Sequence, residues 1–344
     1  MMAVDSRVKP HFYSQHAGVL RAELAAALPA DLLRALHRKT PWRHGVVALR
    51  QFLILGVTTW ALIRAEHPGI WIPLAIVQGF TVFNFTVLLH EVVHHAVFSV
   101  RRQRFERLLG FFYAVPSGIS ATQFTRWHLD HHAELGSPDA DPKRHHLSPK
   151  VNRRWYKFLY CTPALFPIYF RAARRESACY PEEVRHTIAI ERNVSVIVHL
   201  SALGLLVSLG GLGPAWRAYL APVFLVFPVA FTLNRLGQHY SIDPTDPAGW
   251  STLVRGHWFW NFAFLNSNHH LEHHYFPGVP FYRLPGLQQA LRPYYARKGL
   301  RWQSYGSLLW GWFVENNPPH TDWRRAGSGA KMRSDPLSVN TPGT

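Results

Sequence analysis

Four long runs of apolar residues, arranged as two pairs, dominate the hydropathy pattern of this chain. The runs cover residues 46–64, 70–90, 194–210 and 216–236. About 20 apolar residues form a helix of roughly 30 Å, which matches the hydrocarbon core of a bilayer. Short turns join the runs of each pair, at His67-Pro68-Gly69 and at the glycine-rich segment 210–214. The pattern therefore predicts two transmembrane hairpins.

Each hairpin returns the chain to the side from which it started. Histidine clusters begin at the end of the second run and recur beyond the fourth, so we expect all of them on one membrane face. The stretch 98–186 carries 15 Lys and Arg, whereas the hairpin turns carry little beyond Arg64 and Arg217. Cytosolic segments carry an excess of Lys and Arg. The histidine clusters and both termini are therefore predicted to be cytosolic.

The weaker apolar patches complete the predicted architecture. Proline interrupts the patches at 108–121 and 155–170, which favours interfacial or re-entrant helices. His199 lies inside a predicted span, and we expect it to be neutral and hydrogen-bonded between helices. The fold class is then an all-α integral membrane protein with four transmembrane helices and a cytosolic helical cap carrying the histidines. We expect an N-terminal segment at 1–44, a membrane domain at 45–317 and a disordered tail at 318–344.

Composition excludes two other classes of protein. The net charge of +17 would suit a nucleic-acid-binding protein, but no zinc-finger spacing, RNA-recognition signature or repeated basic helix accompanies it. Nucleic acid is therefore not an expected partner. The two cysteines, Cys161 and Cys179, form no CxxC pair and indicate no disulfide framework.

Three histidine clusters carry the candidate chemistry. They read His90-Glu91-Val92-Val93-His94-His95, His128-Leu129-Asp130-His131-His132 and His270-Leu271-Glu272-His273-His274. On a helix, positions i, i+3 and i+4 share one face, so each cluster points several ring nitrogens the same way. Neutral imidazole is a ligand for iron, zinc, copper and nickel. Nine imidazoles exceed what one metal can use, so the clusters predict a two-metal centre.

The first cluster also fits a different class of enzyme. His90 to His94 spells HExxH, the zinc-metalloprotease pattern in which two histidines bind zinc and the glutamate is the general base. A membrane metalloprotease is therefore a distant alternative, although it leaves the second and third clusters without a role.

The spacing of the clusters resembles that of the membrane fatty-acid desaturase and hydroxylase superfamily, with HxxxH followed by two HxxHH boxes. The third segment, 268–280, looks like the acyl desaturase form, and the second, 128–142, is similar also to sphingolipid desaturases. The resemblance covers roughly residues 45–290. It implies four transmembrane helices beneath a cytosolic cap.

The resemblance also implies a ligand set. Iron ligands are expected at His90, His94, His128, His131, His132, His270, His273 and His274, with His239 as the further ligand that precedes the third box. In the family, an asparagine one helical turn before that histidine binds iron through water. Here Arg235 holds that position and Asn234 lies one residue earlier. His95 is an extra histidine beside the first box, and His95 and Asn234 are further candidates to bind a metal or to contact one of its ligands. Glu91, Asp130 and Glu272 are candidates to accept the second ring N–H of a ligand.

The implied activity is O2-dependent oxidation of an unactivated C–H bond by two iron ions. Fatty-acid desaturation is the main expectation, and a lipid or hydrocarbon hydroxylase or a sphingolipid desaturase of the same superfamily is the alternative. The expected substrate is an acyl-lipid, acyl-CoA or acyl-carrier chain that reaches the metals from the bilayer. The turn His67-Pro68-Gly69 is similar to the haem-binding turn of small b-type cytochromes, but no cytochrome-sized domain surrounds it. We therefore expect electrons from a separate ferredoxin-like or cytochrome-type donor.

Overall fold

The computed structural model describes residues 11–137, 140–143, 148–240, 242–243 and 245–319. Throughout this described part the regular structure is helical, and the only pairing of extended backbone is an isolated bridge between Val254 and Gln303. The all-α prediction is therefore confirmed. Most of the predicted tail and the first ten residues lie outside the described residues.

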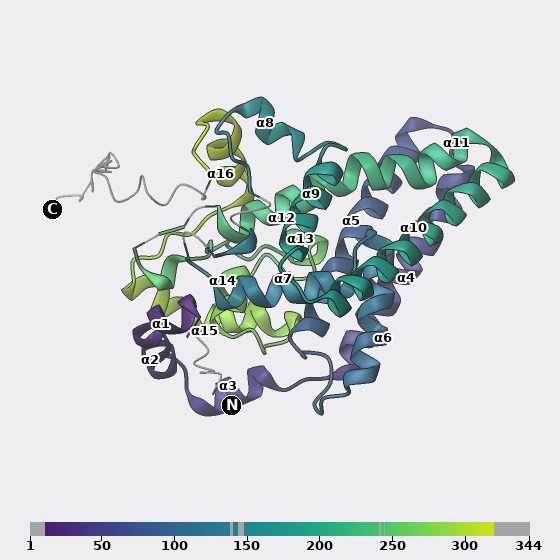
Figure 1. Ribbon diagram of the computed structural model, residues 1–344. Coiled ribbons are helices and arrows are strands. Elements are labelled where there is room, and N and C mark those ends of the chain that lie inside the picture. Colours follow the sequence, from purple (N-terminus) through teal and green to yellow (C-terminus); the bar gives the residue numbers. More distant parts are fainter. Residues whose placement is uncertain (1–10, 138–139, 144–147, 241, 244, 320–344) are drawn as a thin grey trace.

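Two hairpins of long apolar helices form one end of the molecule (Figure 1). The first joins α4 (Pro41–Arg64) to α5 (Pro68–Val93). The second joins α10 (Glu182–Gly210) to a continuous helical stretch made of α11 (Leu212–Ala215), the π-type segment η3 (Trp216–Val226) and α12 (Phe227–His239). All four are long and apolar enough to cross a bilayer. They confirm the four predicted spans.

Local sequence sets where these helices begin and turn. Pro41 and Pro68 stand in the first turns of α4 and α5, where a missing N–H leaves no helical hydrogen bond unmade. The His67 ring also accepts a hydrogen bond from Gly69 N at 3.1 Å, which caps α5. Gly211 adopts φ +77° between α10 and α11, a backbone conformation that suits glycine.

The helices are longer than the hydropathy pattern predicts at their polar ends. Helix α10 begins at Glu182 rather than at 194, and α12 continues through His239. Hydropathy marks only the apolar part of a helix, whereas backbone hydrogen bonding continues into the polar layer. These polar extensions connect the spans to the polar layer of the molecule.

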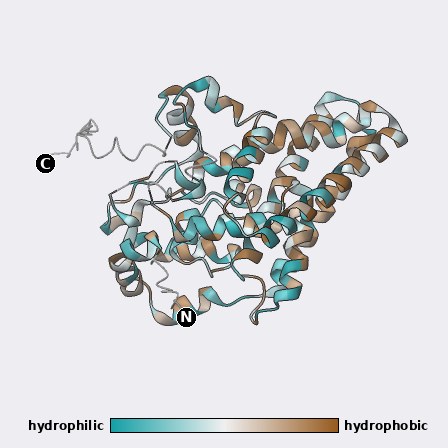
Figure 2. Ribbon diagram, in the orientation of Figure 1, coloured by the Kyte–Doolittle hydropathy of each residue, from teal (hydrophilic) through white to brown (hydrophobic). Residues whose placement is uncertain are grey.

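The outward faces of α4 and α10 remain apolar although nothing in the described part of the chain covers them (Figure 2). On α10, Leu200 and Leu209 are 63% and 72% exposed, and Trp60 on α4 is 59% exposed. A continuous apolar surface of this kind is unfavourable in water and is matched by lipid. Helix α5 is more central, and its buried face packs against η3 and α12.

The two hairpins approach each other closely at a glycine of α5. A β-carbon at Gly79 would lie 2.4 Å from Val226 Cβ, so no larger residue fits without a shift. The adjacent Gln78 donates from Nε2 to the carbonyl oxygen of Ala218 at 2.5 Å.

His199 on α10 is also bonded between segments. Its Nδ1 lies 2.6 Å from Tyr219 Oη, and its Nε2 lies 2.8 Å from the Val115 carbonyl oxygen. The ring therefore links α10 to η3 and to the turn after α6. The predicted interhelical role of His199 is confirmed.

The remaining helices form a polar layer at the other end of the spans (Figures 1 and 2). Their bounds are α1 (Phe12–His16), α2 (Gly18–Ala27), α3 (Ala30–His37), α6 (Gln103–Ala114), α7 (Ala121–Ala133), α8 (Arg154–Leu159), α9 (Leu165–Ser177), α13 (Trp258–Ala263), α14 (His270–Tyr275), α15 (Leu284–Arg297) and α16 (Tyr305–Leu309), with short single turns at Val115–Ser117, Pro247–Gly249, Phe281–Arg283 and Trp310–Val314. One hydrophobic core joins this layer to α5 and α12.

Candidate metal centre

Four helices bring the predicted histidines together. His90 lies in the last turn of α5 and His94 caps its end. The second box lies on α7, whose N-terminus is capped by Ser120, and the third box forms most of α14. His239 is the last residue of α12. All nine predicted ligands are therefore placed by helix ends or by short helices that pack at the base of the spans.

The nine histidines divide into two groups, each able to hold one metal ion. One group contains five ring nitrogens, from His90, His94, His128, His132 and His273. The other contains four, from His131, His239, His270 and His274. The division does not follow the boxes, because the second and third boxes each contribute to both groups.

Distances within the five-histidine group match metal coordination. His128 Nε2 lies 2.8 Å from His94 Nε2 and 3.0 Å from His132 Nε2. His273 Nε2 lies 3.1 Å from His90 Nε2 and 3.0 Å from His132 Nε2. Two ligands at right angles on a metal with bonds of about 2.1 Å are about 3.0 Å apart.

The four-histidine group has the same spacing. His239 Nε2 lies 3.0 Å from both His131 Nε2 and His270 Nε2, and 3.2 Å from His274 Nε2. A single ring nitrogen carries either one proton or one lone pair, so it cannot hydrogen-bond to three others. Convergence on a shared cation explains this arrangement, and the donor set fits a transition metal.

Burial keeps these rings in the form that binds metals. It lowers the pKa of His128, His131 and His132 on α7 well below 6.5. Burial also lowers the pKa of His270, His273 and His274 well below that value. The rings are therefore neutral at pH 7, and each Nε2 has a lone pair to offer.

Two ligands are oriented through their second ring nitrogen by groups that the sequence did not single out. His131 Nδ1 lies 2.8 Å from Asp141 Oδ1, and both side chains are buried. His239 Nδ1 lies 3.1 Å from the carbonyl oxygen of Trp250. Such contacts fix the tautomer and leave Nε2 free for the metal. Asp141 follows the second box by nine residues in a polar segment, but no sequence rule selects it over Asp130.

The acidic residues inside the boxes lie in other surroundings. Asp130 accepts a hydrogen bond from Tyr180 Oη at 3.2 Å, and Glu272 accepts from Gln288 Nε2 and Tyr295 Oη. Glu91 accepts from Phe281 N at 3.0 Å, and its other oxygen is 3.6 Å from His90 Nδ1. Only Glu91 of these three thus approaches a predicted ligand through a contact seen in the described part of the chain.

The two other candidates also lie outside both groups. His95 has φ +52°, and its Nδ1 is 2.8 Å from Glu106 Oε2, so the ring faces α6. Asn234 is buried on α12, where its Nδ2 donates to Ser267 Oγ at 2.7 Å and its Oδ1 accepts from Gln238 Nε2 at 2.6 Å. The Asn234 amide is therefore engaged with two neighbours on the wall of a cavity.

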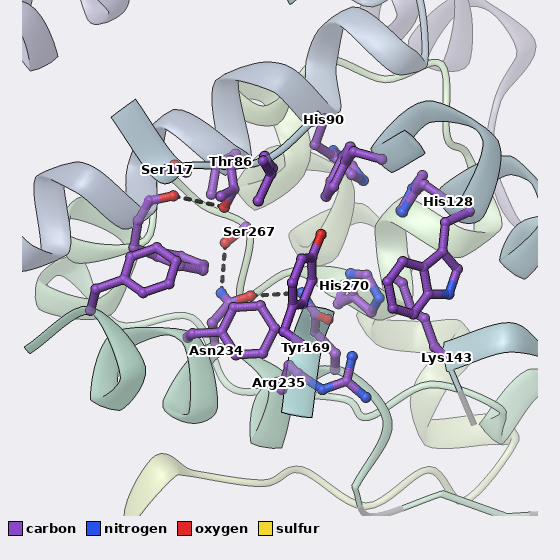
Figure 3. Close-up of a pocket in the computed structure, with 18 of the residues that line it drawn as sticks. Thr86, His90, Ser117, His128, Lys143, Tyr169, Asn234, Arg235, Ser267 and His270 are labelled. Carbon is purple, nitrogen blue, oxygen red and sulfur yellow. Dashed lines mark hydrogen bonds between the residues drawn. The ribbon is translucent and has the colours of Figure 1, made fainter. Parts of the chain in front are cut away.

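That cavity begins at the histidines and is mainly apolar (Figure 3). His90, His128, His270 and His273 line its metal end. Its apolar walls come from residues of α5, α7, α9 and α12, namely Phe83, Val87, Phe124, Trp127, Leu165, Phe166, Phe170, Phe227 and Phe231. The hydroxyl-bearing Thr86 and Ser117 also line it. A lipid chain fits such a lining because its methylenes prefer apolar surface to water.

Comparison with known proteins identifies the family. The family model described as "Fatty acid desaturase" matches residues 66–306, which include all nine histidines of the two groups. This chain belongs to the fatty acid desaturase family. The resemblance inferred from the boxes is thereby confirmed, and the family together with the four apolar helices makes the chain a multi-pass membrane protein.

The similar family members are named for one shared activity. The chain is 27% identical over 319 residues to the Homo sapiens sphingolipid delta(4)-desaturase/C4-monooxygenase DES2, covering 86% of this chain and 88% of that protein. It is 24% identical over 293 residues to the Drosophila melanogaster sphingolipid delta(4)-desaturase DES1, covering 83% and 78%. This member of the fatty acid desaturase family is accordingly an oxidoreductase, and it is similar to sphingolipid desaturases.

Proposed function

We propose that this desaturase uses two iron ions and O2 to oxidise a C–H bond of a sphingolipid-type lipid, introducing a double bond near the polar head. The five-histidine and four-histidine groups would each hold one iron. The irons, reduced by a separate electron donor, would supply O2 activation and hydrogen removal from a methylene. The chain's own residues orient the ligands, hold the lipid and exclude water from the reacting carbons.

The observation that carries this proposal is the position of the two histidine groups at the end of an apolar cavity. Nine neutral nitrogens give each metal a donor set without carboxylates, and the cavity leads a hydrocarbon chain to them. A metalloprotease requires one metal and an accessible polar cleft for a peptide. It would leave six of the box histidines unused.

A sphingolipid-type substrate is better supported than an ordinary fatty acid, which was the main expectation from sequence. The relatives' names specify a delta(4) position, which lies only a few bonds from the polar head of the lipid. In this chain a polar wall formed by Asn234, Gln238 and Ser267 borders the cavity that begins at the histidines. Mid-chain oxidation of a fatty acid would instead favour apolar walls around the reacting carbons.

The proposal also includes the orientation of the chain in the membrane and the source of its electrons. The basic polar layer favours a cytosolic location for the metal centre and both termini. A soluble one-electron carrier of the ferredoxin or cytochrome type would then deliver electrons from the cytosol. The domain boundaries at 45 and 317 stay predictions.

The test is expression in a host with a simple lipid profile, followed by mass spectrometry of total lipids. We expect a product lighter by two hydrogens, with the double bond near the head of a long-chain base, only when O2 is present. A matched strain should express His131→Ala, which removes one predicted ligand. Unchanged lipids with the parent chain and a supplied sphingoid precursor would contradict the proposal, and a double bond in mid-chain would restore the fatty-acid alternative.

A further inference from the structure

Two cationic side chains line the metal end of the cavity. Lys143 and Arg235 belong to separate segments, the loop after α7 and helix α12, and both contribute to the wall that includes His128 and His270 (Figure 3). An apolar lipid tail needs neither of them. Their position therefore calls for a separate explanation.

Lys143 and Arg235 have few hydrogen-bond partners among the described residues. The Lys143 ammonium makes no hydrogen bond with any residue in the described part of the chain, and Arg235 Nη2 reaches Ser148 Oγ at 3.4 Å. Asp141 is the carboxylate that acts electrostatically on both. Its Oδ1 is already occupied by His131 Nδ1 at 2.8 Å and by the Lys143 backbone N–H at 3.0 Å.

Lys143 and Arg235 share this end of the cavity with two carboxylates: Asp141 acts electrostatically on both, and Glu91 lines the same wall beside His90. The histidines around them are neutral, so the two metal ions that the histidine groups would hold would make the overall charge here positive. Burial lowers the pKa of Lys143 to about 7, with a further lowering by Arg235. Unpaired charges in a buried site are costly, and an anion that binds between them removes this cost.

We propose that Lys143 and Arg235 bind an oxyanion, a phosphate or carboxylate, carried by the head of the lipid substrate. Arg235 presents a planar fork of N–H donors and Lys143 a point charge, a pairing suited to such a group. The amides of Asn234 and Gln238 and the hydroxyl of Ser267 lie on the same cavity wall for neighbouring hydroxyl or amide groups. That the occupant is a lipid rests on the proposed function.

This assignment has a consequence for where the lipid is oxidised. The cations lie at the metal end of the cavity, so a bound headgroup would place its first methylenes, and not the middle of the chain, beside the histidines. The phenylalanine-lined remainder would hold the rest of the chain.

The test is a binding experiment on the purified full chain in a neutral detergent, with its metals as isolated, without reductant and under argon. Titration calorimetry would compare octyl phosphate, 1-octanol and inorganic phosphate. For the parent chain we expect octyl phosphate to bind more tightly than either of the others. Lys143→Met and Arg235→Met should each weaken octyl phosphate by about 10- to 100-fold, since one charge-assisted contact is lost. Neither should change the affinity for 1-octanol.

Control variants show whether weaker binding comes from the loss of positive charge in the cavity or from a change in net charge or folding. Arg153→Met removes an exposed cation close by in sequence and should leave binding of octyl phosphate unchanged. Lys143→Arg keeps the charge and should retain most of the affinity. Metal content and thermal unfolding of each variant would show whether the fold is intact.

The outcomes are distinct. Equal affinities of the parent for octyl phosphate and 1-octanol, or unchanged octyl phosphate binding in folded Lys143→Met and Arg235→Met, would overturn the proposal. Inorganic phosphate binding as tightly as octyl phosphate would assign the site to a free anion and overturn the lipid-head assignment. Because no turnover is needed, oxyanion binding without lipid oxidation would contradict the proposed function alone.

Discussion

At the residue scale, the role of each residue near the histidine groups depends on which atoms its side chain contacts, and not only on its residue type. Nε2 of each histidine in the two groups faces its neighbours, and the Nδ1 atoms of His131 and His239 are held by Asp141 and the Trp250 carbonyl. Asp130, although inside the second box, pairs with Tyr180 instead. The aspartate outside the box, and not the one inside it, is therefore expected to orient a ligand.

We predict that Asp141→Asn weakens metal binding by about 10–100-fold, as loss of a contact behind a ligand typically does. The measurement is metal retained per chain after dialysis, and the loss should come from the four-histidine group. Asp130→Asn is the matched control and should retain metal like the parent. Equal retention in both variants would remove Asp141 from this role.

The variant Glu91→Gln would distinguish a metalloprotease from a desaturase. In a metalloprotease Glu91 is the general base, so Glu91→Gln would abolish hydrolysis while zinc stays bound. In the proposed desaturase it accepts a hydrogen bond from Phe281 N and lies near His90, so we expect a partial loss of about 10–100-fold in activity or metal affinity. The assay follows O2- and reductant-dependent conversion of a lipid. A parent activity indifferent to anaerobiosis, together with a dead, zinc-loaded Glu91→Gln, would favour the protease.

At the element scale, close packing of the two hairpins sets the positions of the helix ends that carry His90 and His239. The contact between Gly79 on α5 and Val226 leaves no room for a β-carbon. Because both helices continue directly into the metal centre, a shift at this contact is transmitted along rigid helices to the ligands.

We predict that Gly79→Ala lowers the free energy of unfolding by about 1–3 kcal/mol through overpacking. Thermal unfolding in detergent measures the change. Gly56→Ala on α4 is the control, since a β-carbon there meets no atom within 4 Å, and it should be neutral or slightly stabilising. Similar unfolding temperatures for the two variants would show that the hairpins accommodate the extra methyl group.

Helix α6 contains the start of the apolar patch at 108–121, for which the sequence predicts an interfacial location. Its exposed face carries Phe105, Leu108 and Phe112, at 59%, 52% and 55% exposure, next to exposed Arg104 and Arg107. An apolar stripe flanked by arginines is typical of helices that lie in the membrane interface.

We expect a spin label at Leu108→Cys to be accessible to O2 and protected from a water-soluble relaxing agent in vesicles. A label at Arg104→Cys should show the reverse. Both are made in a chain whose Cys161 and Cys179 are replaced by alanine, because neither cysteine forms a disulfide. Strong relaxation of the Leu108 label by the water-soluble agent would place α6 outside the interface.

At the scale of the whole molecule, the two histidine groups bring together residues from segments between α5 and α14. We predict about two irons per purified chain, since nine imidazoles exceed the coordination of one ion. Chelation should lower the unfolding temperature, because the metals bind the folded state only, and restored iron should recover it. Elemental analysis that finds one zinc and no iron would contradict this prediction of two irons and would favour the metalloprotease alternative.

Hydropathy and residue spacing were sufficient to predict the four spans and the histidines that come together. Hydropathy over about 20 residues reports transfer to lipid, which is a local property of each segment. The i, i+3, i+4 spacing likewise places histidines on a shared helix face without reference to the rest of the chain. The polar start of α10 at Glu182 could not be predicted in this way, because polar helix ends carry no hydropathy signal.

How the histidines divide into two groups, and which residues surround them, depends on tertiary packing. His128 and His132 fall in one group and His131 in the other, because His131 and His132 lie roughly 100° apart around the axis of α7, at two edges of the face that they share. Asp141 contacts His131 from outside α7, and Lys143 and Arg235 line the same cavity although about 90 residues separate them in the sequence. Such contacts arise from packing, and no local pattern encodes them.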